Sequence, residues 1–204
     1  MANLAAFADG VPAPRRRAEG RSWSPTAPRG ACAEFAYVRG AEHPQLATLC
    51  ITNGVTEERF DRALDLVNAT KAHTSSIPDI TLDGEDFGLP DCRFYKLAED
   101  DIRGLFLGEL TGCCQSIGAH GSDCAKHGFT SPHSGFYVVE NNKGDVVGQC
   151  WAWRGEKGEL CLDSLERLGN HITDDQWLAL LKSFAAELEK QWTRHTVTAL
   201  HVGL

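Results

Sequence analysis

The stretch FYVVENNKGDVVGQCWAWRGEKGELCLDSL, residues 136–165, decides the fold of this chain. It contains three runs rich in β-branched and aromatic residues, which strands favour. The runs cover residues 136–140, 146–154 and 159–165. Short turns at 141–144 and 155–158, each containing glycine, separate them. Because turns this short join antiparallel neighbours, the stretch predicts a meander of three antiparallel strands.

A helix and a closing strand are expected after the meander. Thr173 and Gln176 form a capping-box pattern, in which two side chains satisfy backbone amides at the start of a helix. Apolar residues then recur along one helical face: Trp177, Leu180, Leu181, Phe184, Leu188 and Trp192. Residues 196–202 (TVTALHV) predict the closing strand.

The segment before the meander has its own strand and helix signals. Residues 92–97 alternate as a strand does, and Asp100 or Asp101 can cap a helix whose apolar stripe ends at Cys113. Residues 118–135 are rich in Gly, Ser and His and are expected to form a loop. Together these signals predict an α/β fold of the α+β kind, a mixed sheet with a three-strand antiparallel meander and flanking helices.

The N-terminal part of the chain gives weaker signals. Residues 1–30 contain four prolines and no hydrophobic periodicity, which predicts a disordered tail. In the segment 31–90 we expect a short strand at 46–51, a helix beginning after Thr56, and a linker. Residues 91–204 then form the main core.

Composition argues against several classes of function. The chain has 204 residues and a net charge of −8, which disfavours the cationic surfaces that bind nucleic acid. No apolar run is long enough to span a bilayer and the N-terminus lacks a secretion signal, so we expect a cytoplasmic protein that is not a membrane protein. The eight cysteines are then expected to be reduced thiols.

From residue 92 onward the expected order is strand, helix, three-strand meander, helix, strand. This order resembles the acyl-CoA-binding core of the GNAT superfamily of N-acetyltransferases, up to the strand that follows the cofactor-side helix. Segments such as FLGELTGCCQSIG (106–118) and GQCWAWRG (148–155) are also similar to GNAT-like domains of large phage and intracellular-bacterial proteins. The resemblance implies transfer of an acetyl or related acyl group from acetyl-CoA or another acyl-CoA to a small-molecule or peptide amine.

In that family, acyl-CoA enters between the third meander strand and the strand after the helix. The resemblance places the third strand at 159–166 and the pyrophosphate loop at 167–172. The cofactor-binding residues that it implies are Ser164, Leu165, Arg167, Gly169, Asn170 and Thr173. The amide of Leu165 would polarise the thioester carbonyl. Asp174 and Asp175 follow in the first turn of the helix, where we expect each to repel a pyrophosphate by about 1 kcal/mol.

Two carboxylates stand at the end of the third strand. Glu166 is the candidate general base for the amine, and Asp163 is the other catalytic candidate. Strict alternation would place them on opposite faces of the sheet, so that at most one faces a substrate. The simpler interpretation is that both are solvated charges at a strand end.

A stretch rich in Cys and His supports two other interpretations. Zinc prefers tetrahedral sulfur and nitrogen ligands, and the stretch offers Cys113, Cys114, Cys124 and His127. One of these cysteines could instead be a nucleophile, with His120, His127 or His133 as its base.

Other assignments stay open beside acyl transfer. The chain could be a catalytically silent GNAT-like module of a larger assembly, binding a protein partner at the C-terminal edge of the sheet. It could also be a metal-stabilised module around the loop at 113–127. Trp151 and Trp153 alternate on one strand, and we expect them to pack under the helix that carries Trp177 in preference to lining a ligand groove.

Overall fold

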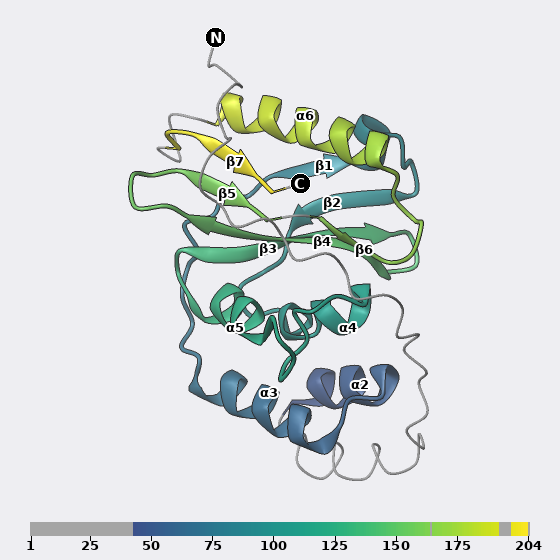
Figure 1. Ribbon diagram of the computed structural model, residues 1–204, viewed down its shortest axis with the longest axis vertical. Helices are drawn as coiled ribbons and strands as arrows, with labels where there is room; N and C mark the ends of the chain where they lie inside the picture. Colours follow the sequence, from purple (N-terminus) through teal and green to yellow (C-terminus); the bar gives the residue numbers. More distant parts are fainter. Residues whose placement is uncertain (1–42, 164, 192–196, 204) are drawn as a thin grey trace.

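The computed structural model describes residues 43–163, 165–191 and 197–203. Its centre is one curled sheet of seven strands in the order β1-β2-β3-β4-β5-β7, with β6 also pairing with β4 (Figure 1). The strands are β1 (Thr81–Asp83), β2 (Cys92–Lys96), β3 (Ser134–Asn141), β4 (Val146–Arg154), β5 (Leu160–Leu162), β6 (Glu166–Arg167) and β7 (Leu200–Val202). All pairs are antiparallel except β5 with β7. The expected α+β class and the meander β3-β4-β5 are confirmed.

Helices cover both faces of this sheet (Figure 1). The α-helices in the described residues are α2 (Pro44–Asn53), α3 (Glu57–Ala69), α4 (Leu107–Thr111), α5 (Ser122–Thr130) and α6 (Asp174–Lys190). Two 3₁₀ helices, η1 (Gly84–Phe87) and η2 (Ile102–Leu105), complete the set. None of these helices has both the length and the apolar character needed to cross a bilayer.

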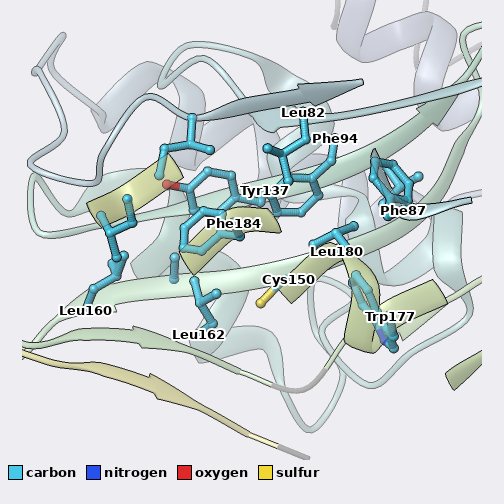
Figure 2. Close-up of a cluster of buried hydrophobic side chains, with 14 of the residues drawn as sticks. Leu82, Phe87, Phe94, Tyr137, Cys150, Leu160, Leu162, Trp177, Leu180 and Phe184 are labelled. Atoms are coloured by element: carbon cyan, nitrogen blue, oxygen red, sulfur yellow. The ribbon is translucent and has the colours of Figure 1, made fainter. Parts of the chain in front are cut away.

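The largest buried cluster lies between the sheet and α6 (Figure 2). Tyr137 of β3 stacks on Phe94 of β2 with ring centroids 5.1 Å apart, and Phe184 of α6 meets both rings edge-on. The buried Tyr137 hydroxyl donates a hydrogen bond to the Pro78 carbonyl, which satisfies both polar groups. This packing fixes the position of α6 on the sheet.

The start of α6 agrees with the sequence. Thr173 accepts from the amide of Gln176, and the Gln176 side chain accepts from the amide of Thr173, so the capping box is confirmed. Gln176 also donates to the Gly88 carbonyl beyond η1 over 2.8 Å. The helix start is therefore held both by its own cap and by a contact to a distant segment.

The opposite face of the sheet is covered by α4 and α5, and α2 and α3 form an outer layer beyond them (Figure 1). Phe136 of β3 is buried in the same cluster as Leu107 of α4. A separate cluster joins the outer layer to the inner one, with Leu46 of α2, Phe60 of α3 and Phe129 of α5 among its members.

The strand predicted at 46–51 is wrong, because these residues belong to α2. Leu46, Ala47 and Cys50 are buried at helical spacing, and Pro44 stands at the first helical position, which suits proline. Burial against η2 and α3 therefore overrides the β propensity of this short apolar run. The helix expected after Thr56 is confirmed as α3.

The loop predicted at 118–135 is also wrong, since α5 occupies its centre. Gly128 allows α5 to pack closely against β3, because a Cβ at this position would overlap the Phe136 ring. The helix predicted from Ile102 to Cys113 is instead broken into η2 and α4, and Gly112 ends α4 with φ of 71°.

Candidate functional site

The third meander strand is interrupted where β5 ends and β6 begins. Leu162 pairs with Ala152, and Glu166 pairs with Gln149, so three residues of this strand lie opposite two residues of β4. One extra residue is therefore inserted at 163–165, which is the definition of a β-bulge. Ser164, one of the expected cofactor-binding residues, lies outside the described residues.

The parallel pairing of the third strand with β7 stops just before the bulge. The parallel pairing of β5 and β7 ends at Leu162 and Val202, followed by a hydrogen bond of 2.8 Å from the Gly203 amide to the Leu162 carbonyl. Past this point, no strand of the described residues pairs with 163–167 on the β7 side. The edge of β6 that faces away from β4 therefore has no partner strand in the described residues, and we refer to this edge as the opening.

The pairing also shows which backbone groups border the opening. Glu166 lies opposite Gln149, and the amide of Leu168 donates to the Val147 carbonyl over 2.9 Å. Because backbone groups alternate along a strand, the amide and carbonyl of the intervening Arg167 point away from β4, toward the opening. The expected cofactor-side residue Leu165 stands at the bulge next to this edge and is half-buried.

The bulge changes the placement of the two candidate catalytic carboxylates. The amide of Asp163 donates to the Trp151 carbonyl over 2.8 Å, so Asp163 lies opposite Trp151, while Glu166 lies opposite Gln149. Trp151 and Gln149 are two residues apart and share the sheet face that α4 and α5 cover. Both carboxylates therefore lie on this face and are half-buried, and the expectation that alternation puts them on opposite faces is wrong.

A buried polar cluster accompanies Glu166 on that face. The side chain of Gln149 is fully buried, and its Nε2 donates to Gln115 Oε1 over 3.1 Å and lies 3.5 Å from Cys113 Sγ. Its Oε1 has no hydrogen-bond partner. Burial raises the pKa of the Cys113 thiol, and the charge of Glu166 adds to this effect. Sequence reasoning missed Gln115 as a member of a site; it took Gln149 either as a substrate contact or, more simply, as an exposed polar residue.

The predicted zinc ligands do not form a metal site in the structure. Cys113 and Cys114 follow α4, whereas Cys124 and His127 belong to α5. In the described part of the chain, no three His, Cys, Asp or Glu side chains gather as a metal site requires. His127 instead packs edge-on against Trp151, with ring centroids 5.7 Å apart.

The pairing of a nucleophilic cysteine with a histidine base is not found either. His133 Nδ1 contacts Ser76 Oγ at 3.3 Å. Burial is the largest cause that raises the pKa of both Cys113 and Cys124, which keeps these thiols protonated at neutral pH. A thiol that stays protonated is a poor nucleophile.

The loop at 167–172 is held in shape by Arg167. Its guanidinium donates to the Ile172 carbonyl over 2.8 Å and forms an ion pair of 2.5 Å with Asp174 in the first turn of α6. Gly169 adopts φ of 54°, a conformation that suits glycine, and Asn170 is exposed. The charge of Asp174 is thus compensated by Arg167, which corrects the expectation that it simply repels an anion here.

The tryptophan pair lies on the face opposite to α6. Trp151 and Trp153 have ring centroids 4.3 Å apart, and Trp151 Nε1 donates to Ser134 Oγ over 2.7 Å. Trp177 belongs to the cluster on the α6 side. The expected packing of Trp151 under α6 is therefore wrong, and Trp151 lies beside Asp163 and α5 instead.

Comparison of this chain with protein-family models, with curated proteins and with solved structures finds no match. A functional assignment therefore depends on the geometry and chemistry of the residues described above.

Proposed function

We propose that this chain is a GNAT-like acyltransferase domain that transfers an acetyl or related acyl group from acyl-CoA to an amine. The observation that supports the proposal is the opening, the edge of β6 that no described strand covers, just after the parallel pairing of β5 with β7 stops at Leu162 and Val202. One extended ligand bound here would contact an unpaired strand edge, a loop and the start of a helix.

The exposed backbone edge suits the pantetheine arm of acyl-CoA. That arm is an extended chain with two amide groups, and extended ligands add to an open sheet edge through main-chain hydrogen bonds. The amide and carbonyl of Arg167 point into the opening and provide one donor and one acceptor. The thioester end of the arm would then reach Leu165, and we infer that its amide polarises the thioester carbonyl.

The pyrophosphate would lie at the loop and at the N-terminus of α6. A helix N-terminus attracts anions through its free amides and its dipole. Arg167 stands at the same end of α6, but its guanidinium is bound to Asp174 and to the Ile172 carbonyl. Binding of a pyrophosphate here therefore requires Arg167 to exchange or share these partners.

Acyl transfer also needs a base that takes a proton from the amine, and a proton for the thiolate of CoA as it leaves. Glu166 lies next to the opening on the face of α4 and α5, and Asp163 now shares that face. We assign the base to Glu166, because its neighbours in the chain border the unpaired edge.

The test is an isothermal titration with acetyl-CoA, together with a spectrophotometric assay of CoA release in the presence of a primary amine. Acetyl-pantetheine lacks the pyrophosphate, so its binding measures the contribution of the strand edge without that of the loop. We expect acetyl-CoA to bind in the micromolar to millimolar range and acetyl-pantetheine to bind more weakly. Absence of binding at millimolar acetyl-CoA refutes the proposal.

Two matched variants identify the base. Glu166→Gln should bind acetyl-CoA as the parent does but release CoA at least about a hundredfold more slowly, as expected for loss of a general base. Asp163→Asn, on the same face, should keep most of the activity. The reverse result would move the role of the base to Asp163.

The alternative function is a silent module that binds a partner through β7. In the described residues, β7 is the last strand of the sheet order, and an outer strand invites pairing. This alternative predicts no acetyl-CoA binding and a complex whose mass exceeds that of one chain by light scattering.

A further inference from the structure

We propose that Cys114 and Cys124 form a redox-active pair, which closes into an intramolecular disulfide by exchange with a small-molecule disulfide such as oxidised glutathione. The pair is a modification site that goes beyond the proposed function and does not depend on it. It lies where the segment after α4 meets the start of α5. Both residues are free thiols in the structure; Cys114 is exposed and Cys124 is partly buried.

The backbone holds Cys114 against the start of α5. The Gly121 amide donates to the Cys114 carbonyl over 2.8 Å, and Gly121 is the residue just before the first residue of α5. The Cys124 amide in turn donates to the Gly121 carbonyl over 3.0 Å. The two cysteines are therefore joined by hydrogen bonds to the same glycine.

The missing side chain of Gly121 leaves room for the Cys114 thiol. A Cβ on Gly121 would lie 3.0 Å from Cys114 Sγ and 2.7 Å from the Cys114 carbonyl oxygen. Residues three apart on a helix have Cβ atoms about 5–6 Å apart, so Cys124 carries its thiol from the next position on the same side of the helix start. A disulfide requires Cβ atoms about 3.5–4.5 Å apart. We expect rotation of both side chains and a small shift of the exposed segment to close the remaining distance.

Electrostatics agrees that the two thiols are neighbours, and the packing disfavours Cys113 as the partner. Burial is the main cause that raises the pKa of Cys124, and the charge of Cys114 is among the causes that raise it further. Cys113 Sγ instead lies 3.5 Å from Nε2 of the buried Gln149. A bond between the adjacent Cys113 and Cys114 would be strained.

The exchange is balanced by the glutathione disulfide that it consumes. The exposed Cys114 attacks one sulfur, which forms a mixed disulfide and releases one glutathione thiolate that takes up the proton lost by Cys114. The sulfur of Cys124 then attacks the sulfur of Cys114, and the proton of Cys124 goes to the second glutathione. Two protein thiols are oxidised, and one disulfide is reduced to two thiols. Because the thiolate is the nucleophile, the raised pKa of Cys124 slows the second step.

The experiment exposes the full chain to excess oxidised glutathione at neutral pH, blocks the remaining thiols with N-ethylmaleimide and maps the links by mass spectrometry. Trypsin leaves Cys113, Cys114 and Cys124 in one peptide, residues 104–126, and a second cleavage before Asp123 separates Cys124 from the other two. We expect the two fragments to remain joined by a disulfide, and a glutathione adduct on Cys114 at early times. In urea the yield of this link should fall about tenfold, since the fold no longer raises the effective concentration of the two thiols.

Four serine variants, each checked for folding by circular dichroism, identify the partners. Cys114→Ser and Cys124→Ser should both lose the link, and Cys124→Ser should keep the glutathione adduct on Cys114. Cys113→Ser should form the link as the parent does, as should Cys161→Ser, which removes a partly buried thiol of β5 as a matched control.

Three results would overturn the inference. The first is the absence of the link in the folded parent, which needs no variant. The second is a link that survives in Cys114→Ser, because Cys113 would then be the partner of Cys124. The third is an equal yield in urea, because the short separation in sequence would then suffice without the fold.

Discussion

The first turn of α6 offers a sharp test of the proposed pyrophosphate site. Asp174 and Asp175 are adjacent and exposed, but only Asp174 forms an ion pair with Arg167. Replacing each by Asn removes one negative charge from the same helix turn and keeps the side-chain size. The two variants therefore distinguish simple repulsion of the pyrophosphate from competition between Asp174 and the pyrophosphate for Arg167.

The magnitude follows from Coulomb's law. Two unit charges about 5 Å apart interact by about 1 kcal/mol at an effective dielectric constant of about 60, between protein surface and water. Asp175→Asn should therefore tighten acetyl-CoA binding about fivefold, since about 1.4 kcal/mol corresponds to a factor of ten. Asp174→Asn should gain more, because the Arg167 guanidinium becomes available to the phosphates.

Calorimetric titrations of acetyl-CoA into the parent and both variants measure these differences. Both gains should shrink between 0.05 and 0.5 M salt, since the Debye length falls from about 14 to about 4 Å. Acetyl-pantetheine should bind all three proteins equally. Equal acetyl-CoA affinity in the parent and in both variants would show that the pyrophosphate does not lie at this turn.

Two further predictions concern the fold and need no ligand. Gly128→Ala places a Cβ in the Phe136 ring, and overpacking of this kind typically costs about 1–3 kcal/mol, which urea unfolding would detect. Gly104→Ala is the control, because its Cβ would meet the same ring at 3.5 Å; an equal loss in both variants would contradict the packing argument. Burial raises the pKa of Glu109 although Arg59 lies 3.5 Å away, so the folded state holds this proton more tightly than the unfolded state. The stabilisation by protonated Glu109 is then complete below the ordinary glutamate pKa of about 4.3 and is lost as pH rises through the pKa of the folded state. Because Gln cannot ionise, the Glu109→Gln variant should gain stability relative to the parent from pH 4 to pH 7. A difference between the two proteins that stays constant over this range of pH would contradict it.

The parts of the fold that sequence predicted well are those where local signals agree with burial. The meander has strong β propensity and glycine turns, and α6 has both a capping box and an apolar face. The prediction of a strand at 46–51 was wrong because a short apolar run is compatible with either a strand or a buried helix. In α5, Gly128 weakens helix propensity but is needed for close contact with Phe136. That requirement arises only from tertiary packing.

The geometry of the candidate site could not be predicted from the sequence. The resemblance placed the site at the third strand and the loop before α6. The structure shows the opening at β6 there and a loop held by the hydrogen bond from Arg167 to the Ile172 carbonyl. The burial of Gln149 could not be inferred, because a polar residue on a strand is usually assigned to the solvent. Its burial depends on Gln115 and Cys113, which are distant in sequence.

A single extra residue in the third strand determines which face of the sheet Glu166 occupies. Without it, the pairing of Asp163 with Trp151 would continue in register, and Glu166 would lie opposite Gly148 on the α6 side. The insertion shifts the register by one, which brings Glu166 opposite Gln149, onto the same face as Asp163. The pairing with β7 stops just before the insertion, and the backbone of Arg167 borders the opening. The open edge and the acidic face therefore lie at the same bulge, and a ligand that uses both must span the strand there.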